Sequence, residues 1–403
     1  MTPLMPVADA YAAVLKDAAP LPEESVALAE AFHRTLARDV ASLRTQPPAA
    51  MSAMDGYAVR AADAVLGARL KVVGEVAAGR PFNATIGAGE AARIFTGGVV
   101  PAGADAVVIQ EDATREGDVV VVNEAPVAGK NIRTAGIDFR EGDVLLRRGA
   151  RLTDRDLGLA AAMNHARLPV HRRPRVAILA TGDELVPPGT TPGPGQIVHS
   201  NAFALAALAR SAGADATDLG VARDTMDATI AAIRRARELG ADVLVTTGGA
   251  SVGDHDMVKC ALEAEGTEMA FWRIALRPGK PMMHGRLGAM RVLGLPGNPV
   301  SSYICAFLFL VPLLRALSGR STIDHPTAPA VLGHALAAND RRQDYLRARI
   351  TDSAGGVPVV ASVGQQDSSL VANLAAADVL IVRPPFAPAA PTGSPCTIIQ
   401  LPA

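Results

Sequence analysis

Residues suited to binding an anion are concentrated between Thr246 and Asp254, where the chain reads Thr-Thr-Gly-Gly-Ala-Ser-Val-Gly-Asp. This segment follows the apolar run Val243-Leu244-Val245, which predicts a buried strand, and Asp254 can cap a helix that comes next. Gly248 and Gly249 permit a tight turn and leave no Cβ between the backbone and a ligand. A strand, a glycine-rich turn and a helix N-terminus together favour an anion or phosphate, although such a turn also serves plain packing of a helix on a strand.

Carboxylates follow two other predicted strands. Glu184 stands in Ala180-Thr181-Gly182-Asp183-Glu184-Leu185, and Asp224 comes just after the neighbouring strand. Together with Asp254 and Asp256 they can converge on one hard cation, and Mg²⁺ prefers a few carboxylates with water and phosphate oxygens. Each of these carboxylates, taken alone, could equally be a helix cap or a surface charge.

A third strand end carries cations beside a predicted helix start. In Leu293-Gly294-Leu295-Pro296-Gly297-Asn298-Pro299-Val300-Ser301, Asn298 is a natural N-cap and Pro299 a natural first helical residue. Just before it lies the loop Arg277-Pro278-Gly279-Lys280-Pro281. A stiff cationic loop beside a helix N-terminus suits an oxyanion, because charge-assisted hydrogen bonds form there with little loss of entropy. Read alone, the loop could equally be a surface turn with solvated charges.

Strands and helices that alternate from Pro174 onward must position these motifs. The predicted strands are 176–180, 217–221, 243–246 and 292–295, and the predicted helices are 201–211, 226–239, 255–264 and 299–317. Such alternation predicts a parallel sheet covered on both faces. Ligands of such sheets bind at the carboxyl ends of the strands, and every polar motif of this region falls there.

The chain of 403 residues is too long for one ordinary core, so we expect a multidomain α/β protein. Residues 1–46 and 134–173 are predicted to form a discontinuous helical domain. In it a helical segment from Val7 to Val40, broken at Pro20 and Pro22, would pack against a helix from Thr153 to Met163. Residues 47–133 alternate short Val/Ile-rich runs with turns, which predicts an inserted β-rich domain. Residues 174–325 would be the α/β domain, and residues 326–403 a small barrel or sandwich.

Composition limits the class of protein. The net charge of −1 gives no general attraction to nucleic acid or to an anionic membrane. Three cysteines without Cys-x-x-Cys spacing argue against a disulfide framework and a zinc site, and reduced thiols fit a cytoplasmic protein. The apolar run from Tyr303 to Leu314 is shorter than the roughly 20 residues that span a bilayer, so it predicts a helix of the core or of a subunit interface.

The motifs in their order resemble the MoeA family of molybdenum insertases, which includes the E domain of gephyrin. Besides the three strand ends and the loop Arg277 to Pro281, the resemblance rests on Ser52-Ala53-Met54-Asp55-Gly56-Tyr57-Ala58 and on Thr96-Gly97-Gly98 with Pro101 to Val107. It runs from about Val7 to the C-terminus. It implies a helical domain, an inserted β-rich domain, a MogA-like parallel-sheet α/β domain that binds molybdopterin, and a C-terminal β-barrel. It also implies a homodimer whose clefts are shared between subunits.

The activity that this resemblance implies is insertion of molybdate into adenylylated molybdopterin, with Mg²⁺-dependent release of AMP, giving molybdenum cofactor. The implied catalytic residues are Asp55, Thr96, Glu184, Asp224, Asp256 and Lys280, with Asp55 and Thr96 reaching the partner subunit's cleft. The implied molybdate ligands are Arg277, Lys280, Pro281, Ser301, Arg347 and Ser368. Binding of the pterin or nucleotide falls to Gly248, Gly249, Ser251, Asp254, Lys259, Pro296, Gly297, Asn298 and Pro299, and Mg²⁺ to Glu184, Asp224, Asp254 and Asp256.

Two positions depart from the family's pattern: Arg277 stands where many members have lysine, and His199 where an acidic residue is frequent. Two other functions stay open. The α/β domain could adenylylate molybdopterin, or the chain could be a scaffold that binds molybdopterin and partner proteins without turnover. The partners to expect are a MogA-like adenylyltransferase and acceptor molybdoenzymes, with neither nucleic acid nor membrane among them.

Overall fold

The computed structural model describes residues 4–248 and 257–402 of an elongated molecule. Its central part is a six-stranded mixed sheet in the order β16-β13-β17-β21-β20-β18. The strands are β13 (Arg175–Thr181), β16 (Asp215–Ala222), β17 (Val243–Thr247), β18 (Glu268–Phe271), β20 (Met283–Leu287) and β21 (Met290–Leu295). The first four strands in this order run parallel, as predicted. At one edge β20 pairs antiparallel with β21, and β18 pairs antiparallel with β20, which the sequence pattern did not predict.

Helices cover both faces of this sheet because its central strands are apolar on both sides. On one face, Val176, Ile178, Val245 and Leu293 pack with helices α1 (Val7–Leu15), α3 (Asn201–Ser211), α6 (Pro299–Cys305) and α7 (Val311–Leu317). On the other face, Ala177, Leu179, Leu244 and Val292 pack with helices α4 (Met226–Glu238) and α5 (Met257–Ala264). The odd and even residues of β13 therefore serve opposite cores.

The helical stretch from α6 to α7 contains one π-helical segment, Ala306–Leu310. Among the described residues, Pro299–Leu317 is the one helix that is long and apolar enough to cross a membrane. However, 83% of its 18-residue apolar segment is buried inside the structure. It belongs to the main hydrophobic cluster, which confirms the predicted core helix.

The N-terminal region differs from the prediction. Helix α1 ends at Leu15, and the chain continues as strand β1 (Glu23–Ala27) and a 3-10 turn (Leu28–Glu30), so the predicted helix up to Val40 is wrong. Pro20 and Pro22 stop the helix, and β1 pairs antiparallel with β12 (Arg167–His171). Helix α1 packs on the α/β sheet rather than against α2 (Asp154–Ala162). Helix α2 begins with a capping box between Thr153 and Asp156.

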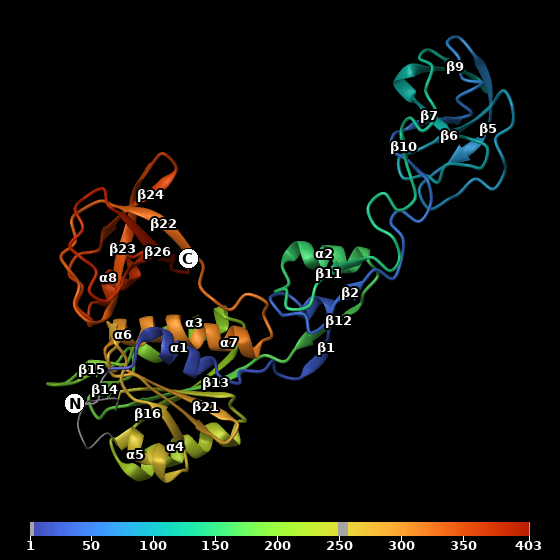
Figure 1. Ribbon diagram of the computed structural model, residues 1–403. Coiled ribbons are helices and arrows are strands. Elements are labelled where there is room, and N and C mark those ends of the chain that lie inside the picture. The colour runs from blue at the N-terminus through green and yellow to red at the C-terminus, as the bar shows by residue number, and fades with distance from the viewer. Residues whose placement is uncertain (1–3, 249–256, 403) are drawn as a thin grey trace.

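The inserted β-rich region lies at one end of the molecule, and two segments of chain connect it to the rest (Figure 1). Its sheet has the order β7-β4-β6-β5-β9-β8. These strands are β4 (Gly56–Val59), β5 (Arg69–Val76), β6 (Glu90–Ile94), β7 (Ala106–Ile109), β8 (Ala113–Glu116) and β9 (Val119–Val122), with a 3-10 turn at Gln110–Asp112. Two short ladders lead to it, β2 (Val40–Ala41) with β11 (Val144–Leu146) and β3 (Met51–Ser52) with β10 (Ile132–Arg133).

The C-terminal strands close into a barrel rather than a sandwich. They are β22 (Thr327–Leu332), β23 (Gln343–Ala354), β24 (Val357–Ser362), β25 (Val379–Arg383) and β26 (Pro395–Gln400), with the short helix α8 (Val371–Ala375) before β25. The order β23-β24-β22-β26-β25 is closed by pairing of β25 with β23. A short strand of the α/β part, β19 (Leu276–Arg277), joins β23 in parallel. The multidomain α/β architecture is thus as predicted, while the proposed domain boundaries stay predictions.

Candidate functional site

A cavity of about 470 Å³ lies where β13, β17 and β21 end. Its lining comes from all three predicted strand ends and from the loop before α8: Thr181, Glu184, Leu185, Ile197, Val198, His199, Ser200, Asn201, Thr247, Gly248, Gly297, Asn298, Pro299, Ser369 and Val371. Ile197 and Val198 form β15, which pairs with β14 (Leu185–Val186) beside the cavity. The topology therefore brings the sequence motifs together at the carboxyl edge of the sheet.

Two glycines allow the motifs to approach one another. Gly248 has a φ of +86°, and a Cβ there would stand 2.5 Å from the carbonyl oxygen of Thr181. A Cβ on Gly297 would stand 3.5 Å from the Cα of Gly248. The glycine-rich turn after β17 and the Pro-Gly-Asn-Pro turn after β21 are thus in backbone contact.

The predicted metal ligands are only partly described. Glu184 lines the cavity, and the backbone N–H of Asp224 donates to Oδ1 of Asp183 at 3.3 Å. Asp254 and Asp256, like Gly249 and Ser251, lie outside the described residues. Within 4–248 and 257–402, no three histidine, cysteine, aspartate or glutamate side chains gather closely enough to hold a metal. The exposed carboxylates at these strand ends fit an ion that takes most of its ligands from water and phosphate, which is the habit of Mg²⁺.

The N-terminus of α6 meets the barrel. Nδ2 of Asn298 donates to Oγ of Ser368 at 2.9 Å, and the N–H of Val300 donates to the carbonyl of Ser368 at 3.1 Å. Asn298 occupies the N-cap position and Pro299 the first turn, as predicted, but the Asn298 side chain makes no capping hydrogen bond. It links two domains instead. Ser301, buried in the same turn, thereby lies close to the Ser368 loop.

Lys280 lies in a loop held against α6. Gly279 has a φ of +120° and packs on Cys305 of α6 so closely that a Cβ would collide with the Cys305 sulfur. Lys280 is half-buried. Among the described residues its ammonium group has no hydrogen-bond or ion-pair partner. The loop thus presents one cation that the described part of the protein does not neutralise, next to Pro281, and it packs on the end of α6 at Cys305.

Arg277, in the same loop, is engaged by the barrel. Its Nε and Nη2 donate to the two carboxylate oxygens of Asp344, its Nη2 also reaches Oδ1 of Asn339 at 2.8 Å, and its Nη1 reaches Asp340 at 3.3 Å. The Asp344 carboxylate raises the pKa of Arg277 above its usual range. Four of the five guanidinium donors are therefore used within the protein.

Arg347 supports the loop that carries Ser368. The residue is 1% exposed. Its Nη1 donates to the carbonyl of Asp367 at 2.8 Å, its Nη2 to that of Gln365 at 3.3 Å, and its Nε to the Gln366 side chain at 3.3 Å. Burial lowers the pKa of the guanidinium. Arg347 and Ser368 are therefore brought together, with Arg347 beneath the loop.

Asp55 and Thr96 contact each other but lie in the distant β-rich region (Figure 1). The backbone N–H and Oγ1 of Thr96 both donate to Oδ1 of Asp55, at 2.7 and 2.8 Å, and these hydrogen bonds lower the pKa of Asp55. They are not brought to the cavity of their own chain. Lys259 lies over the Trp272 ring, 4.1 Å from its centroid, and 3.6 Å from Glu263, and it is not among the residues that line the cavity.

Three cavity residues were not predicted as ligands. His199 is 6% exposed and Thr181 is 3% exposed, and among the described residues neither Nε2 of His199 nor Oγ1 of Thr181 has a partner. Nδ2 of Asn201 donates to the carbonyl of Gly297 at 2.8 Å and so fixes the Pro-Gly-Asn-Pro turn. The only sequence signal was His199-Ser200-Asn201 at the start of a predicted helix. Buried polar atoms of this kind are the groups that a ligand can satisfy.

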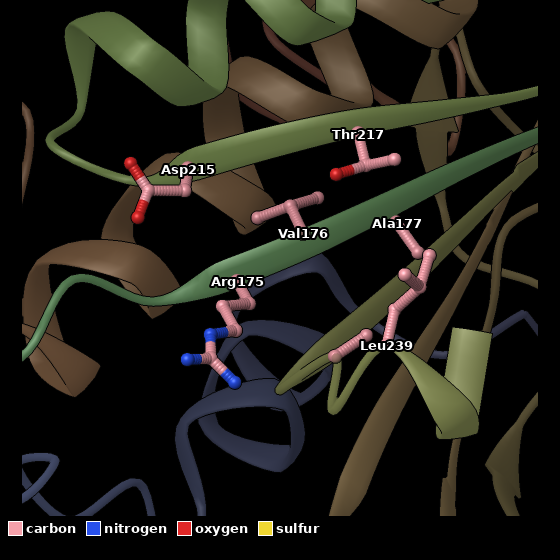
Figure 2. Close-up of a pocket in the computed structure, with 7 residues that line it drawn as sticks. Arg175, Val176, Ala177, Asp215, Thr217 and Leu239 are labelled. Carbon is pink, nitrogen blue, oxygen red and sulfur yellow. The ribbon is translucent and has the colours of Figure 1, made fainter.

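A smaller hollow of about 210 Å³ lies at the opposite edge of the sheet. Figure 2 shows Arg175 and Asp215 there, at the starts of β13 and β16, beside Val176, Ala177 and Thr217. None of the predicted site residues lines it. The amino edge of the sheet therefore lacks the convergence of motifs seen at the carboxyl edge.

Comparison with known proteins agrees with this architecture. Residues 5–164 match the family model described as MoeA N-terminal region (domain I and II), residues 177–316 that of a probable molybdopterin binding domain, and residues 329–401 that of MoeA C-terminal region (domain IV). The chain belongs to the MoeA family.

Two curated relatives and one solved structure illustrate the likeness. The molybdopterin molybdenumtransferase of Haemophilus influenzae is 36% identical over 367 residues, covering 90% of each chain. That of a Nostoc species is 35% identical over 388 residues, covering 94% of this chain and 89% of the relative. The crystal structure of a molybdopterin biosynthesis MoeA protein from Pyrococcus horikoshii superposes with a TM-score of 0.86 at 30% identity, covering 100% of both chains.

Proposed function

We propose that this protein is a molybdopterin molybdenumtransferase of molybdenum cofactor biosynthesis, and that it inserts molybdate into adenylylated molybdopterin with Mg²⁺-dependent release of AMP. The single observation that carries this proposal is the position of the α6 N-terminus. It borders the 470 Å³ cavity through Asn298 and Pro299 and contacts the Ser368 loop of the barrel. A large organic ligand and a small oxyanion can therefore bind next to each other.

Molybdate, in this proposal, binds where the Lys280 loop, the first turn of α6 and the Ser368 loop approach one another. A tetrahedral dianion requires cations and hydrogen-bond donors. Lys280 offers a charge without a partner among the described residues, and Ser301 and Ser368 offer hydroxyl donors. The helix N-terminus adds backbone donors and a favourable dipole.

Molybdopterin and its adenylyl group occupy the cavity. Thr181 and His199 are buried there with polar atoms that no described residue satisfies, and Gly248 and Gly297 let the ligand approach the backbone closely. When bound, Mg²⁺ would neutralise the phosphoanhydride, and Glu184 and Asp224, with Asp254 and Asp256, would hold it. Water cleaves the anhydride bond to release AMP. The two dithiolene sulfurs replace oxygen on molybdate, the displaced oxygen leaves as water with the thiol protons, and molybdenum keeps its oxidation state.

A homodimer with shared clefts completes the proposal. Asp55 and Thr96 lie far from the cavity of their own chain (Figure 1), so a catalytic role for them requires the cavity of a second copy. Light scattering at micromolar concentration tests this part. A monomer with full activity would contradict it.

The same geometry leaves two competing functions to exclude by experiment. Purified protein is incubated with adenylylated molybdopterin, Mg²⁺ and molybdate, and in parallel with molybdopterin and ATP. AMP release that depends on molybdate and accompanies cofactor formation supports the proposal. Adenylylation of molybdopterin from ATP would instead support an adenylyltransferase, and tight binding without either product would support a scaffold. A cytoplasmic location, a docked adenylyltransferase and acceptor molybdoenzymes belong to the proposal as its cellular context.

A further inference from the structure

We infer that Arg277 is a positioning residue that fixes the spacing between Lys280 and Arg347, and that it does not bind molybdate itself. This inference rests on the proposed function. It concerns the junction between the loop 277–281 of the α/β part and strand β23 of the barrel.

The junction is built around Asp344. This carboxylate is 4% exposed, and a buried carboxylate requires a compensating charge. Arg277 supplies that charge through both of its forked donors, Nε and Nη2. The bidentate geometry fixes direction as well as distance, which a lysine ammonium cannot do.

The surrounding residues complete a neutral cluster. Arg342 donates to Asp340 through Nη2 at 3.0 Å, and Asp340 also receives Nη1 of Arg277. Asn339 accepts from Arg277 and donates to the carbonyls of Arg342 and Pro384, both at 2.8 Å. Two arginines thus face two aspartates, and the charge of Arg277 is balanced before any oxyanion arrives.

The register of the paired strands lets this cluster set the distance between Lys280 and Arg347. Strand β19 pairs in parallel with β23 so that Arg277 stands opposite Asp344 and Leu276 opposite Gln343. Lys280 follows Arg277 by three residues, and Arg347 follows Asp344 by three residues. Lys280 and Arg347 therefore each lie three residues beyond the Arg277–Asp344 ion pair. The ion pair fixes the start of both segments, and Arg347 in turn supports the Ser368 loop.

The two possible roles of Arg277 predict opposite effects of Asp344. If Arg277 is a molybdate ligand, Asp344→Asn frees its charge and leaves the half-saturating molybdate concentration unchanged or lowers it. If Arg277 is a positioning residue, Asp344→Asn raises that concentration as Arg277→Ala does. The double variant is then no worse than either single variant, because the two changes break one interaction.

The experiment measures AMP release against molybdate concentration in the parent, Arg277→Ala, Asp344→Asn, the double variant and Arg277→Lys. Arg341→Ala is the matched control, because Arg341 is exposed in the same loop and stands outside the Arg277, Arg342, Asp340 and Asp344 cluster. We expect each single variant and the double variant to show half-saturation raised about tenfold, with little change in maximal rate, Arg277→Lys to recover part of the loss, and the control to match the parent.

A rise for Arg277→Ala together with an unchanged or lowered value for Asp344→Asn would overturn the inference. Asp344→Asn keeps the side-chain shape, so it remains informative if Arg277→Ala fails to fold. A parent without molybdate-dependent AMP release would refute the proposed function instead. An active parent with a response to Lys280→Ala but none to the Asp344 variant would refute only the positioning role.

Discussion

Lys280→Ala and Arg347→Ala are both expected to weaken molybdate binding, the first by removing a direct ligand and the second by loosening the Ser368 loop, and to differ in their effect on folding. Lys280 has no partner among the described residues, so its removal breaks no contact within that part of the protein. Arg347 is 1% exposed and holds the carbonyls of Gln365 and Asp367. Its removal leaves these acceptors without their donor.

The magnitudes follow from these contacts. For Lys280→Ala, loss of one charge-assisted hydrogen bond to the dianion costs about 1.5–3 kcal/mol, which is roughly a 10- to 150-fold rise in half-saturating molybdate. For Lys280→Ala the free energy of unfolding should change by no more than about 0.5 kcal/mol, as at ordinary surface positions. For Arg347→Ala it should fall by about 2–5 kcal/mol, because buried acceptors lose their partners.

The assay combines AMP release against molybdate concentration with urea unfolding of the same preparations. Lys71→Ala, at an exposed position of the β-rich region, is the matched control and should match the parent in both measurements. An unchanged half-saturation in Lys280→Ala would remove this residue from the molybdate site. Equal stability of Arg347→Ala and the parent would show that the Ser368 loop does not depend on the guanidinium.

Three further changes test other parts of the structure. Gly248→Ala should lower AMP release at least about tenfold, because a left-handed φ costs an alanine roughly 1–2 kcal/mol and its Cβ would press on the Thr181 carbonyl. The control is Gly189→Ala, since Gly189 has a φ of +90° and open space around it. Equal rates for both variants would contradict the close approach. Thr96→Val should raise the pKa of Asp55, seen by NMR titration of the carboxyl carbon. Since the folded-state pKa is lowered, the stability that Thr96 adds is present above the ordinary carboxyl pKa and is lost as the pH falls through the folded value, and a stability difference that persists in acid would refute the assignment. Arg291→Met should cost about 2–4 kcal/mol in urea unfolding, because the buried guanidinium holds the carbonyls of Val14 and Lys16 at the end of α1, both at 2.9 Å. Arg286→Met, which removes a half-buried guanidinium from the same Lys16 carbonyl, should cost clearly less, and an equal cost for the two would contradict a role for burial.

The central sheet could be predicted because local sequence patterns specify its strands and the helices between them. The apolar runs of β13, β17 and β21 and the helix signals between them specify a parallel sheet without knowledge of distant contacts. Once the sheet is parallel, the motifs after its strands must share one edge. That is why the sequence alone predicts that Thr181, Gly248 and Gly297 meet.

Distant contacts account for what the sequence pattern missed. The segment Glu23–Ala27 becomes a strand because β12, more than a hundred residues later, pairs with it. The Asn298 side chain turns from its helix to Ser368 of the barrel, and Arg277 finds Asp344 only because β19 joins β23. The burial of the His199 side chain likewise depends on the packed structure, so neighbouring residues in the sequence do not predict it.

The most direct test of the account is the position of molybdenum itself, located by anomalous scattering in a crystal soaked with molybdate. The account predicts a peak between Lys280, Ser301 and Ser368 at the N-terminus of α6, with the Arg277 guanidinium still bound to Asp344. A peak elsewhere on the protein, or none at this position in a fully soaked crystal, would contradict it.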